Sequence, residues 1–214
     1  MAIVGENHAF GIRYVHVPKT GGTWIKRVLR MRSTLASDAE LLTIGSIRHP
    51  VDWHASAYRF FVIRKGGPHP IFWAASDEGR RTCSETIRAI YEDRQAVYQR
   101  AMRRAARNTA ELNRIMITAP QDISRWYHTD AGLLQYLRDH ELSGCDHVIS
   151  LERIRHALQG IVAGRVPQEV VDDIQAMPPV NTTLRPDTSI DVDEDAARIV
   201  QTTHSAMMEE FGYG

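Results

Sequence analysis

The chain has 214 residues, of which 24% are charged and 43% hydrophobic. Lysine plus arginine and aspartate plus glutamate both number 26, so the zero net charge excludes a basic nucleic-acid-binding composition. No apolar stretch reaches the roughly 18 residues of a membrane span, and no basic-then-apolar signal pattern opens the chain. Two cysteines are too few for a disulfide framework. We therefore expect one domain over residues 1–214, cytoplasmic, with no membrane or nucleic-acid partner.

The first predicted strand covers residues 12–17 and runs directly into a glycine-rich turn. The strand is mostly apolar and β-branched, and a helix is expected from about residue 22 to 32. Gly21 and Gly22 allow close approach of the backbone to a ligand, and the free amides of a helix start favour an anion. Lys19 adds a cation beside the turn. The segment predicts a phosphate-binding loop.

The second predicted strand, residues 42–47, leads to Arg48 and then to a helix over residues 51–64. An arginine at a strand end can bind a phosphate through two parallel hydrogen bonds. Ser56 follows about two helical turns later and can add a neutral donor. We expect Arg48 and Ser56 to bind one phosphate group together. A solvated strand-end charge and a surface helix residue are the alternative.

The remaining pattern is mostly helical, with one more strand. We predict an ordered loop over residues 66–82, helices over 84–107, 131–140, 153–163 and 192–211, and a strand over 146–151. Alternating strands and helices predict an α/β fold with a central parallel sheet and helices on both faces.

The loop sequence from Pro18 to Trp24 resembles the 5′-phosphosulfate loop of sulfotransferases that use 3′-phosphoadenosine 5′-phosphosulfate (PAPS). Arg48 and Ser56 also keep the eight-residue spacing of the 3′-phosphate motif in that family. The Walker A order fails, because the lysine precedes the glycines. The resemblance implies a three-layer, P-loop-like fold and transfer of a sulfuryl group from PAPS to a hydroxyl or amine, without a metal ion.

The resemblance also implies roles for the loop residues. Lys19 would stabilise the charge that grows on the bridging oxygen as the nucleotide leaves. The implied nucleotide-binding residues beside it are Thr20, Gly21, Gly22, Thr23 and Trp24. Trp24 would stack on adenine, and a core aromatic at the helix start is the open alternative.

Two late segments resemble the carbohydrate branch of the family. Residues 181–185 read Asn-Thr-Thr-Leu-Arg, and residues 211–213 read Phe-Gly-Tyr. The Arg-Lys-Gly triplet of cytosolic members is absent from the late loop. The resemblance implies that Thr182, Thr183 and Arg185 bind the nucleotide instead. It also favours a carbohydrate or another small molecule as acceptor.

An acceptor hydroxyl also needs a general base, which the sequence does not single out. The candidates are Glu40, His54 and His69. A lone histidine is more often structural than catalytic, so the base stays unassigned.

Arginines are concentrated between residues 80 and 107, where acidic residues are fewer. One hypothesis is that this face attracts an acidic acceptor, and a solvated helix face is the alternative. Two other functions also remain open. A P-loop small-molecule kinase would share the fold, and a non-catalytic module that binds adenosine bisphosphate would share the arginine–serine pair.

Overall fold

A computed structural model describes residues 7–17, 19–31, 41–64, 69–107, 120–129, 131–178 and 190–213. The chain divides into two compact units, which are described separately. The sheet unit comprises residues 3–49 and 138–186, and the helical unit comprises residues 1–2, 50–137 and 187–214. A single folding domain over the whole chain stays a prediction.

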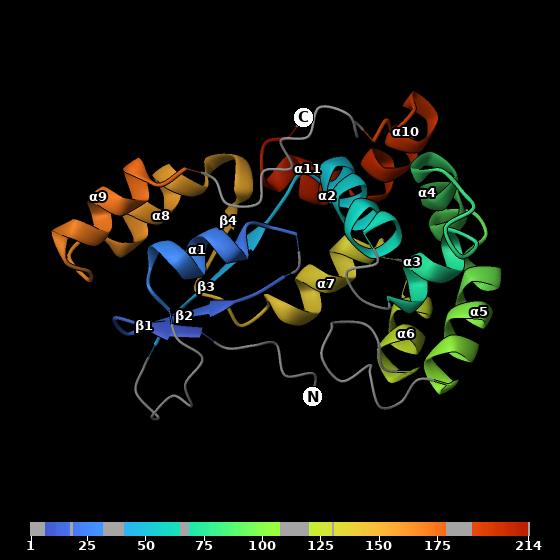
Figure 1. Cartoon of the computed structure of the whole chain (residues 1–214), viewed down its shortest axis with the longest axis horizontal. Helices are drawn as coiled ribbons and strands as arrows, with labels where there is room; N and C mark the ends of the chain where they lie inside the picture. Colours follow the sequence, from blue (N-terminus) through green and yellow to red (C-terminus); the bar gives the residue numbers. More distant parts are fainter. Residues whose placement is uncertain are drawn as a thin grey trace. The chain divides into compact units, whose positions relative to one another are not determined.

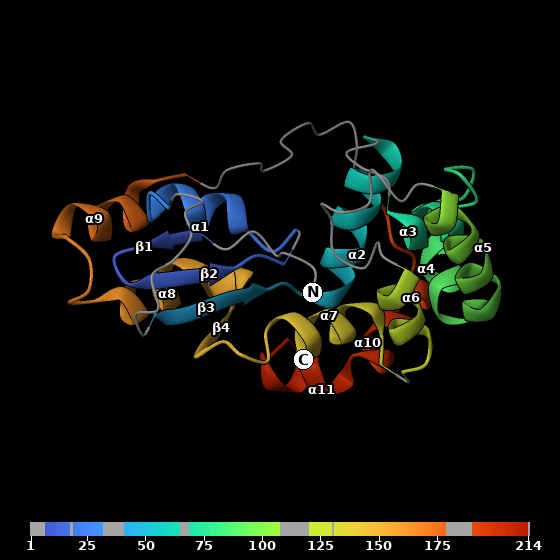
Figure 2. The ribbon, with the colours of Figure 1, turned by 90° about the horizontal axis from the view of Figure 1, so that it is seen from below.

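The described residues of the sheet unit contain four strands in the order β1-β2-β3-β4 (Figure 2). They span Asn7–Ala9 (β1), Ile12–Val15 (β2), Leu42–Ile47 (β3) and His147–Ser150 (β4). β2, β3 and β4 are parallel, so the predicted α/β class and parallel strands are confirmed. β1 was not predicted, and it pairs antiparallel with β2. Phe10 and Gly11 between them both have positive φ, as a tight hairpin turn requires.

Three helices of the sheet unit lie on the same side of its strands (Figure 1). They are α1 (Gly22–Val28), α8 (Ile154–Val162), which follows the short 3₁₀ turn η3 (Leu151–Arg153), and α9 (Gln168–Ala176). Tyr14, Ile44 and Ile149 share this face of the sheet because Tyr14 pairs with Ile44, and Ser46 pairs with Ile149. Their side chains and the apolar faces of the three helices form one buried core. A helical layer on the opposite face stays a prediction.

Helices form the described part of the helical unit. Their bounds are Pro50–Tyr58 (α2), Arg59–Ile63 (η1, a π-helix), Pro70–Ala75 (α3), Cys83–Tyr91 (α4), Arg94–Arg107 (α5), Pro120–Tyr127 (α6), Leu133–Glu141 (α7, up to Leu137), Glu194–Thr203 (α10) and Ser205–Glu210 (α11). α5 packs against α3 and α6 (Figure 2). α4 packs against α2 and α10.

Several predicted boundaries were wrong. The expected helix over 84–107 is two helices, because the chain turns at Glu92 and Asp93. The expected helix over 192–211 is interrupted at His204, which leaves helical geometry with φ −108°. The expected loop over 66–82 contains α3, which begins at Pro70 because proline is favoured in a first helical turn. α6 and α9 were not predicted.

Among the described residues, no helix is long and apolar enough to cross a bilayer. The same part of the chain holds no group of three or more histidine, cysteine or acidic side chains positioned for a metal ion.

Candidate functional site

A buried network of hydroxyl groups holds the loop that follows β2. The Tyr14 hydroxyl lies 2.5 Å from Ser46 Oγ on β3. Ser46 Oγ donates to the Thr20 carbonyl at 2.8 Å, and Thr20 Oγ1 donates to the Val17 carbonyl at 2.7 Å. Tyr14, Thr20 and Ser46 are completely buried, and burial raises the pKa of Tyr14 to about 12. The loop is therefore fixed to two neighbouring strands by groups that stay neutral.

Glycine is required at two successive positions of this loop for different reasons. Gly21 has φ +89°, a left-handed conformation that disfavours side chains. Gly22 has no such φ, but a Cβ there would lie 2.9 Å from Cε1 and the hydroxyl oxygen of Tyr14. Lys19 also adopts a positive φ of 69°, which is uncommon for a residue with a side chain. The backbone at Lys19 is therefore held in a costly conformation by its surroundings.

Thr20 and Thr23 have different environments, although both were predicted to hold phosphate or sulfuryl oxygens. The Thr20 hydroxyl is buried and already donates to a protein carbonyl, so its side chain orders the loop. Thr23 is exposed in the first turn of α1. The amides at the start of α1 fall among those that a helix leaves without internal partners. Direct contact between Thr20 and a ligand stays a prediction.

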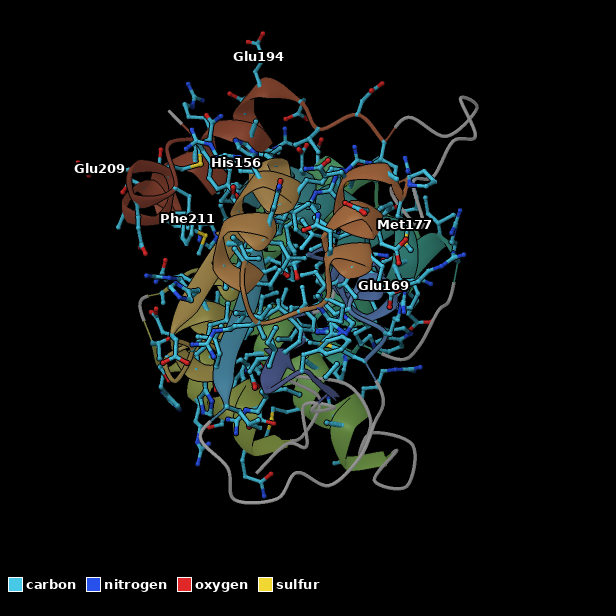
Figure 3. The ribbon with its side chains drawn as sticks, turned by 90° about the vertical axis from the view of Figure 1, so that its left-hand side faces the viewer. His156, Glu169, Met177, Glu194, Glu209 and Phe211 are labelled. Atoms are coloured by element: carbon cyan, nitrogen blue, oxygen red, sulfur yellow. The ribbon has the colours of Figure 1, made fainter. Side chains whose placement is uncertain are left out.

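Trp24 belongs to the hydrophobic core of the sheet unit. It is 4% exposed, and its indole Nε1 donates to the carbonyl of Met177 at 3.3 Å. Figure 3 labels Met177, which directly follows α9, and Glu169, which lies in the first turn of that helix. The packing supports the core alternative for Trp24, and stacking on adenine stays a prediction.

Arg48 directly follows β3, and the Lys19 loop follows β2, the strand that pairs with β3 in the sheet. β2 and β3 are parallel neighbours in register from Ile12 and Leu42 to Val15 and Gly45. The segments that follow them therefore leave the sheet at one edge, where open α/β sheets bind ligands. The Nε of Arg48 is buried and has no hydrogen-bond partner among the described residues. A buried unsatisfied donor is costly, so this guanidinium is suited to an anionic ligand.

The third parallel strand contributes a residue that the sequence did not reveal. Glu152 follows β4 in the turn η3, and its Oε1 accepts a hydrogen bond from the backbone amide of His49 at 3.1 Å. This contact orients the residue directly after Arg48. In the sequence, the sign of this contact is an acidic residue placed directly after a predicted buried strand. For the hydroxyl network, the sequence signal is clearer: Ser46 is a polar residue within an apolar strand.

Ser56 lies on α2 in the helical unit and is half-buried. Arg48 belongs to the sheet unit, so joint binding of one phosphate by Arg48 and Ser56 stays a prediction. Glu40, Thr182, Thr183 and Arg185 lie outside the described residues.

His54 is completely buried within the helical unit and contacts two groups through its two ring nitrogens. Nδ1 lies 2.8 Å from the Pro50 carbonyl, and Nε2 lies 2.7 Å from the Tyr91 hydroxyl, which is also 2.9 Å from Nε2 of His204. A carbonyl only accepts, so His54 donates from Nδ1 and accepts from Tyr91 at Nε2. Burial lowers the pKa of His54 to about 4, and it lowers the pKa of His204 to about 3. This arrangement favours a structural role for His54.

His69 is buried as well, at the start of α3. Its ring lies 4.6 Å from that of Phe61 and 5.2 Å from that of Phe72, measured between centroids. Burial lowers its pKa to about 3, so the imidazole is neutral at ordinary pH. A neutral imidazole could accept a proton, but this ring is packed among aromatic side chains. Its role as the general base stays a prediction.

Comparisons with protein-family models, with curated proteins and with solved structures find no match.

Proposed function

We propose that the protein is a sulfotransferase that moves a sulfuryl group from PAPS to a hydroxyl or amine of a carbohydrate or other small molecule. The observation that carries this proposal is the placement of Lys19 and Arg48 after two neighbouring parallel strands. Two cations at one sheet edge suit a ligand with two anionic groups. The strand–loop–helix from β2 to α1 also supports a P-loop-like fold with three layers, which we propose with it.

The loop would bind the 5′ end of the nucleotide, and Arg48 its 3′-phosphate. The amides of Gly21, Gly22 and Thr23 suit the 5′-phosphosulfate because helix starts favour anions. The buried Nε of Arg48 has no hydrogen-bond partner within the described ranges, and a phosphate oxygen would supply one. Ser56 would add a neutral donor. Thr182, Thr183 and Arg185 are proposed to complete nucleotide binding.

PAPS would supply the activated sulfuryl group for an in-line displacement. The acceptor oxygen forms a bond to sulfur while the bond from sulfur to the 5′-phosphate oxygen breaks, and that oxygen keeps the electron pair. The ammonium group of Lys19 would stabilise the negative charge on the leaving oxygen more in the transition state than before it. The acceptor proton passes to a base that is not assigned among Glu40, His54 and His69.

A second candidate is a non-catalytic module that binds adenosine 3′,5′-bisphosphate. The observation that favours it is the burial of His54 and His69, the two described candidates for the base. Such a module would keep the arginine and the loop but would have no turnover. Retained nucleotide binding, with no sulfated product from a broad panel of hydroxyl and amine acceptors, would favour this candidate.

Calorimetry with adenosine 3′,5′-bisphosphate tests the nucleotide site. We expect saturable binding that is unchanged by magnesium and much weaker for AMP, which lacks the 3′-phosphate. Equal binding of the two nucleotides would contradict the role of Arg48. A strict requirement for magnesium, with ATP as the tighter ligand, would favour a P-loop kinase instead.

A further inference from the structure

A cavity of about 420 Å³ lies in the helical unit between α3, the turn after it, and α5. It is lined chiefly by one aromatic and five charged side chains: Trp73, Asp77, Glu78, Arg100, Arg103 and Arg104. A volume of this order suits a small ligand. The proposed nucleotide chemistry uses none of these residues.

Arg103 and Arg104 follow Arg100 on α5 by three and four residues, so each is its neighbour on the helix surface, and all three line the cavity. Cζ of Arg104 lies 4.1 Å from the centroid of the Trp73 ring. Stacking of this kind fixes the plane of a guanidinium and leaves its N–H groups free to donate at the edge. The Nε of Arg104 is buried and has no hydrogen-bond partner in the described part of the chain. Arg104 is thus a pre-oriented donor.

The turn after α3 brings two carboxylates to the same cavity. Their backbone adopts an unfavourable left-handed conformation there. Asp77 and Glu78 have φ of 51° and 62°, and Gly79 has φ of 89°. Left-handed geometry is unfavourable for residues such as glutamate. The turn is kept by Ser76, whose Oγ accepts from the Gly79 amide at 3.0 Å and whose carbonyl accepts from the Arg81 amide at 2.9 Å. Strained residues of this kind cluster at ligand sites.

The charges around the cavity leave a positive excess. Both oxygens of Asp77 accept from Arg80 at 2.9 Å, and Arg100 lies 3.7 Å from Asp77. The hydrogen bonds from Arg80 hold the pKa of Asp77 below its usual value, so this carboxylate stays ionised and paired. Among the described lining residues, Glu78 is the one further carboxylate beside Arg103 and Arg104. An anion is therefore favoured, and Glu78 can accept a hydrogen bond from a neutral part of the same ligand.

We propose that this cavity binds a phosphate or sulfate monoester of a sugar or polyol. The guanidinium groups of Arg103 and Arg104 hold the tetrahedral oxyanion. The Glu78 carboxylate accepts from a ligand hydroxyl and disfavours a bare inorganic anion. The site shares no residue with the proposed nucleotide site.

Calorimetry with glucose 6-phosphate, glucose 6-sulfate, glucose and inorganic phosphate tests the proposal. We expect at least one ester to bind saturably and more tightly than inorganic phosphate, and glucose not to bind. The tighter of the two esters identifies the natural oxyanion. Binding of neither ester, or equal binding of ester and inorganic phosphate, would overturn the proposal.

Two substitutions locate the binding. Arg104→Lys keeps the charge but loses the planar fork, so we expect about a tenfold loss of affinity for the ester. Arg103→Gln is at an exposed residue that can be changed without disturbing the fold, and we expect a loss of similar size. Arg198→Gln, on the exposed surface of α10, is the matched control and should bind as the unchanged protein does. Unchanged affinity in both cavity variants, with native circular dichroism, would refute the site.

Two further variants separate this site from the nucleotide site. Lys19→Ala and Arg48→Ala should leave ester binding unchanged, whatever they do to adenosine 3′,5′-bisphosphate. If ester binding falls together with nucleotide binding in these variants, the ester occupies the nucleotide site and the cavity proposal fails. If only nucleotide binding is absent, the proposed function fails and the cavity stands.

Discussion

Two buried polar networks in the described part of this protein are built from different chemistry. In the sheet unit, the hydroxyls of Tyr14, Thr20 and Ser46 fix the loop that carries Lys19. In the helical unit, His54 and His204 flank the Tyr91 hydroxyl and join α2, α4 and the turn between α10 and α11. Hydroxyl groups remain neutral across the ordinary pH range, whereas an exposed imidazole gains a proton as the pH falls below about 6.5. The hydroxyl network therefore suits a loop that must stay rigid at every ordinary pH. The histidine network makes the stability of the fold sensitive to acid.

The largest expected effect is on the rate of sulfuryl transfer, which should depend on Lys19 in the loop and not on the histidine network. If Lys19 stabilises the leaving oxygen, Lys19→Ala should lower the rate of sulfuryl transfer by about 10²–10³-fold with little loss of nucleotide affinity. A single-turnover assay with PAPS measures the rate, and calorimetry measures the affinity.

His54→Gln is the matched variant for this comparison. It should reduce stability but leave the transfer rate of the folded protein within a few-fold of the unchanged protein. A loss of activity in His54→Gln as large as in Lys19→Ala would make His54 the base and abolish the distinction between the two networks.

Arg48→Ala should act on binding and not on chemistry. Loss of a charged hydrogen bond to a buried phosphate costs about 2–4 kcal/mol of affinity. Titration with adenosine 3′,5′-bisphosphate and with AMP measures it. The variant should bind both nucleotides equally, and a surviving preference for the 3′-phosphorylated form would contradict the assignment.

The histidine network predicts a loss of stability in acid. Burial lowers the pKa of His54 to about 4 and that of His204 to about 3, from 6.5 for an exposed histidine. Below about pH 6.5 the unfolded chain binds more protons than the folded one, so the free energy of unfolding falls as pH decreases toward the folded pKa values. The loss is about 1.4 kcal/mol for each pKa unit and each histidine.

Urea unfolding between about pH 7.5 and about pH 5 measures this slope, which is expected to be flat above the unfolded pKa. His54→Gln should give a shallower slope than the unchanged protein. A slope that is identical in both proteins would show that His54 is not responsible for the acid sensitivity.

The smallest expected effect concerns the hydroxyl network. Tyr14→Phe removes one partner of Ser46 within the core and should cost about 1–2 kcal/mol of unfolding free energy. The cost should not change with pH, unlike that of the histidine network. Tyr98→Phe, at a half-buried ring stacked on Tyr127, is the control. A pH-dependent cost in Tyr14→Phe would contradict the contrast between the networks.

Local sequence signals account for much of the fold. The apolar strand over residues 42–47 has the predicted bounds. The start of α4 is set by a capping box in which Thr82 accepts from the Glu85 amide and the Glu85 side chain accepts from the Thr82 amide. β1 escaped prediction because Asn7, His8 and Ala9 have low strand propensity, and they form a strand by pairing with β2.

The site was predictable only in part, because its supports lie far apart in sequence. The glycines and Lys19 formed a local motif, and their loop does follow a strand. Ser46 is 26 residues from Thr20, and His204 is 113 residues from Tyr91. No periodicity links such partners. A buried tyrosine and a strand serine have many possible contacts, and only the folded chain selects one.

The four tryptophans provide separate spectroscopic reporters for the two units. Trp24 is the sole tryptophan in the sequence of the sheet unit, and Trp53, Trp73 and Trp126 belong to the helical unit. Fluorescence of a protein that keeps Trp24 alone would follow melting of the sheet unit, and replacing Trp24 with phenylalanine would leave emission from the helical unit. Coincident transitions in the two proteins would show that the chain melts as a single cooperative body.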